Sequence, residues 1–456
     1  MSGRVAVIGG GVSGLTTAYR LDAAGIDATV LEAGPTTGGK LRSVEVGGLR
    51  LPAGPDSFLA RKPWAVELCR ELGIGDELVA PRASGAFLWT AAGLVPYPTG
   101  TAFGIPGDLG DAFRWPGLSR RGRRRAFLDL LKPKRRVDAD ESLGGLLRRR
   151  LGDEATDLAI GPLLGGLYAG DVDQLSVRAT FPELQKWEAA QGSLLRGAQV
   201  ASRNGRRSVG GPMFLKPRAG VERLTDVLAE RAGDRVHTDA RATAVERASD
   251  GWRVLMADGV VEADAVVITV DAPAAAGLLP RDAAAAPKLA QIPFVSTAAV
   301  LFVYPEGTAG DLPDGSGFVV PRGAAPMTAS TWLSAKWPDP AYGDRAVLRC
   351  FVGAAGEEDI VDAPDADLIA ACARHLAALL PLPDRPEHAA VVRWPAAMPQ
   401  YLVGHLDRVA EIRDGLPAGI FVTGQSLDGV GIADCVRAAG TAAEQVATYL
   451  AQEARA

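Results

Sequence analysis

The start of the chain changes from strand-like to helical spacing and back. Arg4–Ile8 is a short β-branched apolar run, and a glycine-rich turn follows it directly. Leu15, Ala18 and Leu21 then recur at helical spacing, and residues 29–31 form a second strand-like run. This order predicts a strand–helix–strand unit at the beginning of the chain.

Two different patterns follow. From about residue 103 to residue 203 the chain has helical periodicity and many arginines, which predicts a helical region. Residues 365–380 and 432–451 also have helical spacing. Later β-branched runs predict strands at residues 236–245, 252–256, 260–262, 265–270, 296–304, 317–320, 346–352, 390–394 and 420–423. Strands mixed with helices in this way predict an α/β fold.

Composition narrows the class of protein. Of the 456 residues, 47% are hydrophobic and 23% are charged, which is typical of an ordinary globular core. The net charge of −5 excludes a nucleic-acid-binding protein that depends on a global positive field. The four cysteines form no CxxC pair and the four histidines form no HExxH motif, so we predict neither a metal centre nor a disulfide scaffold.

From the sequence we expect neither a signal peptide nor a transmembrane helix. The first residues lack the charged, apolar and cleavage-site regions of a signal peptide, and no run of about 18 apolar residues suited to a transmembrane helix occurs. We therefore expect a cytoplasmic protein without a transmembrane segment. Contact with a membrane surface stays open.

The first motif that carries chemistry is a glycine turn between the first strand and the first helix. Its glycines have G-x-G-x-x-G spacing, and Glu32 closes the second strand. In this context the pattern predicts a dinucleotide site, with the pyrophosphate at the helix N-terminus and the acid on the ribose hydroxyls. The predicted cofactor residues here are Gly9, Gly10, Gly11, Val12, Ser13, Gly14, Leu31 and Glu32.

A second glycine pair, Gly38-Gly39, follows soon after Glu32. It is similar to the GG-R-x-x-S/T element of the FAD-binding amine oxidase and phytoene desaturase superfamily, with Lys40 in place of the arginine. A lysine pairs with phosphate without the two-pronged guanidinium geometry. The same segment matches the first part of a P-loop, but Leu41 has no hydroxyl for Mg²⁺, which argues against an ATPase.

A third motif lies near the C-terminus, where the last predicted strand leads through a glycine-rich turn into the last helix. The turn runs from Gly424 to Ile432. A helix N-terminus that faces the flavin would stabilise the negative charge that the flavin N1–C2=O edge gains on reduction. We therefore predict that Gly424, Val430, Gly431 and Ile432 contact the cofactor.

Three further motifs, taken together with the end of the third motif, make the resemblance more specific. Together they resemble the bacterial HemY-type porphyrinogen oxidases, in the same order and over nearly the whole chain. This family includes protoporphyrinogen oxidase and coproporphyrinogen III oxidase. The motifs are Gly54-Pro55-Asp56-Ser57-Phe58, Gly166-Leu167-Tyr168-Ala169-Gly170-Asp171, Pro399-Gln400-Tyr401 with His405, and Gly429-Val430-Gly431-Ile432.

The resemblance implies a three-part architecture. A discontinuous Rossmann-like FAD-binding domain is expected from residues 1–55, 218–290 and 396–456. A mixed-sheet substrate domain is expected from residues 56–95 and 291–395, and an inserted, mostly helical domain from residues 96–217. The resemblance also implies a noncovalent FAD held in addition by Gly38, Gly39, Lys40, Gly54, Pro55, Asp56, Ser57 and Val236.

The resemblance further implies the reaction. Coproporphyrinogen III would be oxidised to coproporphyrin III in haem biosynthesis, with six electrons removed in three flavin turnovers and molecular oxygen reduced to hydrogen peroxide. No catalytic side chain is expected, because the flavin carries the chemistry. Substrate contacts are expected from Lys62, Gly166, Gly317, Phe318, Val319 and Phe351, and a ferrochelatase-type enzyme is a candidate partner.

One charge feature stands apart from the motifs. Nine basic residues crowd into 17 positions against a single acid, Asp129. This stretch could be a solvated helical face, could contact anionic lipid, or could steer a substrate with propionate groups. The residues are Arg120, Arg121, Arg123, Arg124, Arg125, Lys132, Lys134, Arg135 and Arg136.

Several alternative functions remain open. Protoporphyrinogen IX is the first alternative substrate, and a carotenoid desaturase or an amine oxidase is a more remote enzyme. A non-enzymatic protein similar to the dissociation inhibitors of prenylated GTPases would share the fold. The intact glycine turn, Glu32 and the C-terminal motif favour a flavoprotein over that binding protein.

Overall fold

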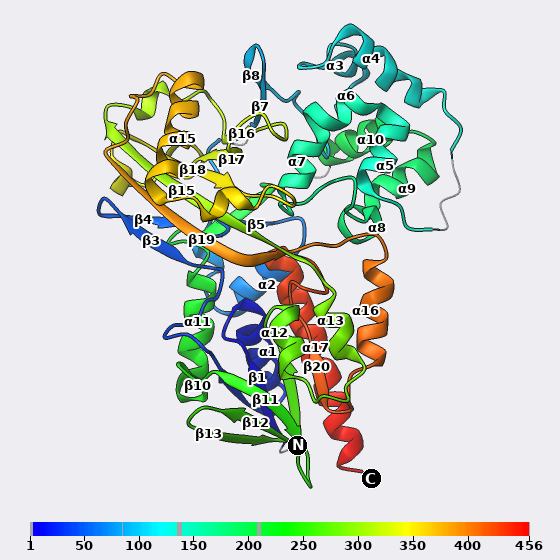
Figure 1. Ribbon diagram of the computed structural model, residues 1–456, viewed down its shortest axis with the longest axis vertical. Coiled ribbons are helices and arrows are strands. Elements are labelled where there is room, and N and C mark those ends of the chain that lie inside the picture. The colour runs from blue at the N-terminus through cyan, green and yellow to red at the C-terminus, as the bar shows by residue number, and fades with distance from the viewer. Residues whose placement is uncertain (1–2, 84, 135–138, 208–210, 456) are drawn as a thin grey trace.

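The computed structural model describes residues 3–83, 85–134, 139–207 and 211–455. Figure 1 shows a lower part that holds a parallel sheet, both chain termini and the long C-terminal helix. The upper part has a second sheet on one side and a group of helices on the other. The basic residues Arg135 and Arg136 lie outside the described residues.

The lower sheet has five strands, and all of its neighbouring strands run parallel. Their order is β10-β2-β1-β14-β20. The strands are β1 (Arg4–Ile8), β2 (Asp27–Leu31), β10 (Val236–His237), β14 (Ala265–Ile268) and β20 (Ile420–Val422). Segments from the start, middle and end of the chain thus meet in one sheet, as expected of a Rossmann-like domain.

Both faces of this sheet are covered. Val5 and Val7 of β1 face one core, and Ala6 and Ile8 face the other, because successive side chains of a strand point to opposite faces. The first core is closed by α1 (Val12–Ala23), α2 (Trp64–Glu71), α11 (Arg223–Ala232) and α17 (Ile432–Glu453). The second is closed by α12 (Ala272–Leu278), α13 (Ala285–Ala290), α16 (His405–Asp414), β11 (Ala242–Arg247), β12 (Trp252–Met256) and β13 (Gly259–Ala263).

The upper sheet has seven strands in the order β19-β15-β18-β17-β16-β7-β8. Its neighbours are antiparallel except for β16 and β7. Helix α15 (Asp365–Leu379) covers one face. The strands are β7 (Phe87–Thr90), β8 (Gly93–Pro96), β15 (Phe294–Glu306), β16 (Gly317–Val319), β17 (Met327–Trp332), β18 (Arg345–Val352) and β19 (His388–Pro399).

A hairpin and short elements join the two sheets. The hairpin β3 (Ser43–Val46) with β4 (Leu49–Pro52) packs on the face of the upper sheet opposite α15, beside α14 (Leu333–Lys336). Three short strands form a separate small sheet: β5 (Phe58–Leu59), β6 (Leu78–Val79) and β9 (Phe214–Pro217). The short 3₁₀ turns are Gly75–Glu77, Leu128–Leu130, Gly233–Arg235, Ala309–Asp311, Pro340–Tyr342 and Asp359–Asp362.

The helical group has its own apolar core. Its helices are α3 (Leu109–Phe113), α4 (Arg120–Phe127), α5 (Leu143–Leu151), α6 (Asp153–Ala155), a π-helical turn (Thr156–Ile160), α7 (Gly161–Gly166), α8 (Val177–Thr180), α9 (Pro182–Gln191) and α10 (Leu194–Arg207).

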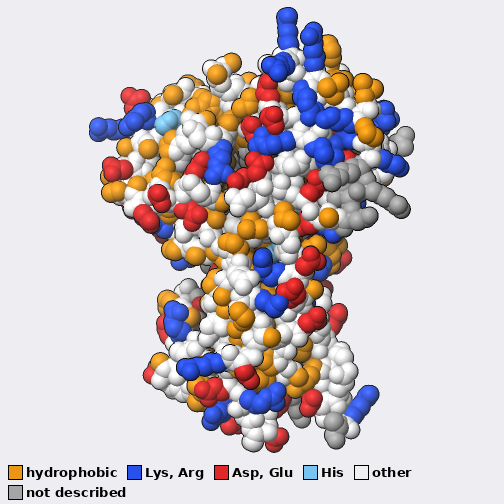
Figure 2. All heavy atoms as spheres, turned by 45° about the vertical axis from the view of Figure 1, so that its right-hand side comes forward, with side chains coloured by type: hydrophobic (Ala, Val, Ile, Leu, Met, Phe, Trp, Pro, Cys, Tyr) orange, Lys and Arg blue, Asp and Glu red, His pale blue; other side chains and the backbone are white. Residues whose placement is uncertain are grey.

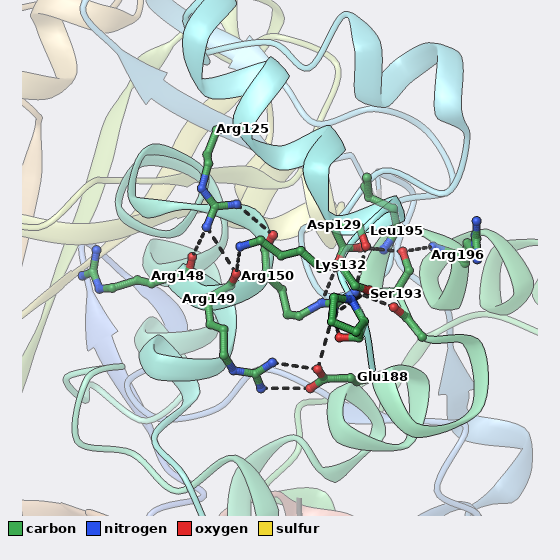
Figure 3. Close-up of polar contacts among 12 residues, drawn as sticks. Arg125, Asp129, Lys132, Arg148, Arg149, Arg150, Glu188, Ser193, Leu195 and Arg196 are labelled. Carbon is green, nitrogen blue, oxygen red and sulfur yellow. Dashed lines mark hydrogen bonds and ion pairs between the residues drawn. The ribbon is translucent and has the colours of Figure 1, made fainter. Parts of the chain in front are cut away.

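A buried charge network fixes the helical group. Asp129, Arg150 and Glu188 are each at most 1% exposed, and Figure 3 shows that they point toward one another. Arg150 Nε donates to Asp129 at 2.5 Å, and Arg149 donates twice to Glu188 at 2.7 and 2.9 Å. Removing one partner from such a network costs about 3–5 kcal/mol, because the other charge stays buried.

The structure confirms the α/β class and the Rossmann-like sheet, and it refines several predicted elements. The single strand predicted at 236–245 is two strands, β10 and β11, in different sheets. Strand β17 was not predicted, because its Met-Thr-Ala-Ser-Thr-Trp sequence alternates polar and small residues rather than forming an apolar run. The domain boundaries stay a prediction.

Candidate active site

The first two glycine motifs lie against one another at the carboxyl end of the parallel sheet. Gly38 N–H donates to Gly10 C=O at 2.9 Å, and Gly11 and Gly38 form a β-bridge. A Cβ on Gly14 would lie 1.8 Å from Gly9 O, and one on Gly39 would lie 3.2 Å from Gly11 Cα. Only glycine permits this close approach of the two backbones.

Glu32 holds the same turn in place. Its carboxylate accepts the Gly10 N–H at 2.7 Å and the Gly34 N–H at 2.8 Å. It follows Leu31 at the end of β2, and Glu32 N–H donates to His237 C=O at 2.8 Å, next to Val236 of β10. Glu32 is half-buried. Because it directly follows β2, its carboxylate lies at the carboxyl end of the parallel sheet, where a ribose would be recognised.

The C-terminal motif reaches the same place. A Cβ on Gly424 would lie 3.4 Å from Ser13 Oγ in the first turn of α1. Helix α1 starts after Gly11 and helix α17 starts after Gly431, and neither N-terminus has a side-chain cap. Both helices therefore direct partly positive backbone N–H groups toward the glycine turns without a capping side chain.

These features fit FAD. The tight glycine turns leave the backbone accessible to a pyrophosphate, and uncapped helix N-termini favour anionic groups. Glu32 is placed at the end of β2, as the acid that recognises a ribose must be. The residues that would hold the dinucleotide are those of the two glycine turns, Glu32 and the residues that lead into α17.

Tyr401 fixes the turn that leads into α17. Its hydroxyl accepts the Gly429 N–H at 2.8 Å and donates to Gln425 C=O. The tyrosine is 1% exposed, and its ring stacks on His405 with ring centroids 3.9 Å apart. The Pro-Gln-Tyr motif is thus a support for the C-terminal cofactor loop, a contact that the sequence did not reveal.

Lys40 is held by protein groups. Its ammonium donates to both carboxylate oxygens of Asp271 at 3.1 and 2.8 Å and to Ala397 C=O at 2.9 Å. Gln425 donates to Asp271 and Ala397 as well, at 2.7 and 3.0 Å. Asp271 and Gln425 follow β14 and β20, so this cluster ties the ends of two strands to the second glycine motif. Its role toward phosphate stays a prediction.

The Gly54–Ser57 segment couples the two sheets. Asp56 is 7% exposed and contacts Lys336 at 3.0 Å and Arg349 at 3.1 Å. Burial alone raises the pKa of a carboxyl group, but the two cations hold the pKa of Asp56 well below its usual range. Arg349 also donates to the carbonyls of Pro52 and Gly54.

Arg349 and Lys336 were missed by sequence reasoning. A signal for Arg349 was present, because it is the one charged residue inside the apolar stretch of residues 346–352. A charge in the middle of a buried strand requires a partner. Position 54 must be a glycine for a separate reason: a Cβ there would lie 2.1 Å from Lys40 O and would clash with it.

The predicted substrate residues of the upper sheet divide between its two faces. Val319, Ala329 and Phe351 are paired across β16, β17 and β18, so their side chains share one face. Val319 packs against the helical group, whereas Phe318 is 2% exposed in the core beneath α15. Strand alternation therefore directs Phe318 away from Val319 and Phe351, and we remove it from the candidate substrate contacts.

Gly317 and Gly166 differ in their surroundings. A Cβ on Gly317 would lie 2.0 Å from Ser330 O, so this glycine serves close strand packing. Gly166 ends α7, is exposed, and has open space at its Cβ position. The turn after Gly166 is linked to the Pro-Gln-Tyr motif, because Gln400 donates to Tyr168 C=O at 2.8 Å.

Lys62, predicted to meet a substrate carboxylate, is paired within the protein. Its ammonium contacts both oxygens of Asp434 at 2.7 and 2.6 Å. Asp434 lies in the first turn of α17. This places Lys62 beside the C-terminal cofactor motif.

The basic stretch contains residues that are paired within the protein and residues that are exposed. Arg125 and Lys132 donate to the last carbonyls of α5, where cations are favoured. Arg120, Arg121, Arg124 and Lys134 are exposed. Figure 2 shows Lys and Arg side chains gathered over the helical group at the top of the view.

The structure identifies no grouping of metal-ligating side chains and no helix long and apolar enough to cross a membrane, within the residues that it describes.

Comparison with known proteins assigns the class. The family of flavin-containing amine oxidoreductases matches residues 12–447. The chain belongs to this family, and its cofactor is FAD. It is a flavin-dependent oxidoreductase.

Individual relatives cover nearly the whole chain. The coproporphyrinogen III oxidase of Bacillus subtilis is 34% identical over 98% of both chains. The chloroplastic protoporphyrinogen oxidase of Nicotiana tabacum is 29% identical over 98% of this chain and 86% of its own. A crystal structure of an Exiguobacterium protein assigned as a protoporphyrinogen oxidase is 34% identical, covers 97% of this chain and 98% of its own, and superposes with a TM-score of 0.87. The chain is thus similar to the porphyrinogen oxidases within the family.

We expect Glu32→Ala to weaken FAD binding by at least about tenfold, since hydrogen bonds to a charged group contribute about 1.5–3 kcal/mol. The measurement is FAD affinity by flavin fluorescence on the apoprotein. Glu45→Ala, at an exposed position of β3, is the control and should leave the affinity unchanged. Unchanged affinity in Glu32→Ala would show that the ribose assignment is wrong.

We also expect acid to destabilise the protein through His405. Burial lowers the pKa of His405 to about 4, below its ordinary value of 6.5. Neutral His405 therefore supports the folded state fully above pH 6.5, and this contribution is lost as pH falls toward 4.

The loss amounts to about 3 kcal/mol at most, at 1.36 kcal/mol per pKa unit. His405→Phe keeps an aromatic ring against Tyr401 and should lose less stability between pH 6.5 and pH 4.5 than the parent. Thermal unfolding at several pH values measures the difference. The same pH dependence in both proteins would contradict the assignment.

Proposed function

We propose that the protein oxidises coproporphyrinogen III to coproporphyrin III in haem biosynthesis. The observation that carries this proposal is the similarity over 98% of the chain to a relative named coproporphyrinogen III oxidase. The geometry is consistent with it, because α7, which ends at Gly166, packs against β16 and β17, and β16 carries Val319 of the apolar face. Protoporphyrinogen IX is the alternative substrate.

FAD, when bound, accepts two electrons at a time from the substrate. Removal of six hydrogens from a porphyrinogen requires three such turnovers, and three molecules of oxygen would become three of hydrogen peroxide. The chain contributes binding and electrostatics. The uncapped N-terminus of α17 stabilises negative charge, Val319 and Phe351 offer apolar contacts to the macrocycle, and the Gly166 carbonyl is a candidate acceptor for a pyrrole N–H.

The remaining parts of the proposal concern location and partners. All four cysteines are free and buried, which fits a reducing compartment, and we infer a cytoplasmic site of action. A ferrochelatase-type partner that takes the porphyrin stays an implication of the family resemblance. The exposed basic surface supports peripheral contact with anionic lipid.

Apolar side chains accompany that basic surface. Phe113 is 71% exposed, Leu128 is 47% exposed and Leu131 is 81% exposed. Exposed apolar side chains flanked by arginines are typical of surfaces that rest on anionic membranes.

The substrate proposal is tested with coproporphyrinogen III and protoporphyrinogen IX side by side, by porphyrin fluorescence in air. We expect faster turnover of coproporphyrinogen III. Gly166→Leu should keep FAD, because the Cβ position is open, and should lower turnover by about tenfold or more through misplaced substrate. Gly277→Leu, at an exposed and open position of α12, is the control.

Preference for protoporphyrinogen IX would change the substrate assignment and keep the reaction type. Full activity of Gly166→Leu would remove this turn from the substrate site.

The lipid proposal predicts sedimentation with phosphatidylglycerol vesicles that high salt abolishes, because salt screens charge attraction. Phe113→Ser with Leu131→Ser should weaken binding. Val260→Ser, at a 52% exposed position of β13, should not. Equal binding to neutral phosphatidylcholine vesicles, or no binding to either, would contradict the proposal.

A further inference from the structure

The ion pair between Lys62 and Asp434 has a more defined geometry than an ordinary surface pair. The Lys62 ammonium contacts both carboxylate oxygens, at 2.7 and 2.6 Å, and the Asp434 side chain is only 15% exposed. Exposed ion pairs contribute little to stability, because water screens them. A mostly buried carboxylate is screened less, so its charge acts more strongly on neighbouring groups.

Asp434 lies against the C-terminal glycine turn. A Cβ on Gly429 would lie 2.7 Å from Asp434 Cβ, and one on Gly431 would lie 2.9 Å from Asp434 Oδ2. These glycines leave space for the carboxylate directly at the N-terminus of α17. A negative charge at this place is favourable for the helix but offsets the positive end of its dipole.

The charge of Asp434 also acts on Tyr168, which lies two residues after Gly166. Burial raises the pKa of Tyr168, and the charge of Asp434 raises it further. Asp434 therefore lies at the cofactor motif, and its charge also acts on the turn that follows Gly166. Without a counter-charge, it would oppose the gain of negative charge by a flavin at the α17 N-terminus.

We propose that Lys62 is a positioning residue for the flavin: it neutralises Asp434 and so keeps the α17 N-terminus electropositive toward the reduced cofactor. Lys62 acts through Asp434 and does not bind a substrate carboxylate. The proposal requires FAD at the C-terminal motif and does not depend on which porphyrinogen is the substrate.

The test is the midpoint potential of the bound FAD in the holoenzyme, measured by dye-coupled reductive titration without substrate. Lys62→Met should lower the equilibrium constant for two-electron reduction about tenfold, which is about 30 mV. Asp434→Asn should raise it by a similar factor. The double variant should return to within about threefold of the parent, because both charges are then absent.

A matched control separates this effect from a general loss of charge. Lys288→Met breaks the exposed Lys288–Glu411 pair between α13 and α16 and should leave the potential unchanged. Steady-state assays add a second readout, since the proposal predicts a fall in kcat for Lys62→Met at unchanged KM.

Three results would overturn the proposal. The first is an unchanged potential in Lys62→Met. The second is a raised KM for porphyrinogen with unchanged kcat, which would make Lys62 a substrate contact. The third is loss of FAD from Lys62→Met that the double variant does not restore. Failure of the porphyrinogen assay alone would leave the electrochemical result valid.

Discussion

The buried contact of Asp56 with Arg349 and Lys336 is the interaction on which the arrangement of the active site depends. Asp56 belongs to the segment that follows the β3–β4 hairpin, whereas Arg349 and Lys336 belong to the upper sheet region. The contact joins β18, the strand that carries Phe351, to the Gly54–Ser57 segment, which packs against Lys40 of the second glycine motif. Removing one member of such a buried pair costs about 3–5 kcal/mol, because the other charge stays buried without a partner. The contact therefore holds the Gly54–Ser57 segment firmly against the upper sheet.

The cofactor half of the site could be predicted from the sequence because its constraints are local. Gly14 and Gly39 are required by backbone approaches of 1.8 and 3.2 Å to a would-be Cβ, and such requirements restrict a position to glycine. Glu32 is set by the length of one strand–helix–strand unit. Motif spacing therefore located these residues without any knowledge of long-range contacts.

The substrate half could not be predicted to the same depth. Phe318 and Phe351 are both aromatic residues in apolar strands, and only the strand pairing shows that they face opposite sides of the sheet. Lys62 contacts Asp434, 372 positions away in sequence, and Gln400 contacts the Tyr168 carbonyl, 232 positions away. Long-range pairings of this kind leave no periodic signal, so their roles follow from the fold.

The most direct test of the account is anaerobic mixing of the purified holoprotein with coproporphyrinogen III. We predict that the visible flavin absorbance is lost and that one coproporphyrin forms for every three flavins reduced. Readmission of air should restore the absorbance. Retention of the oxidised flavin spectrum in the presence of excess coproporphyrinogen III would contradict the proposed function, and protoporphyrinogen IX and amines would then be tested in the same way.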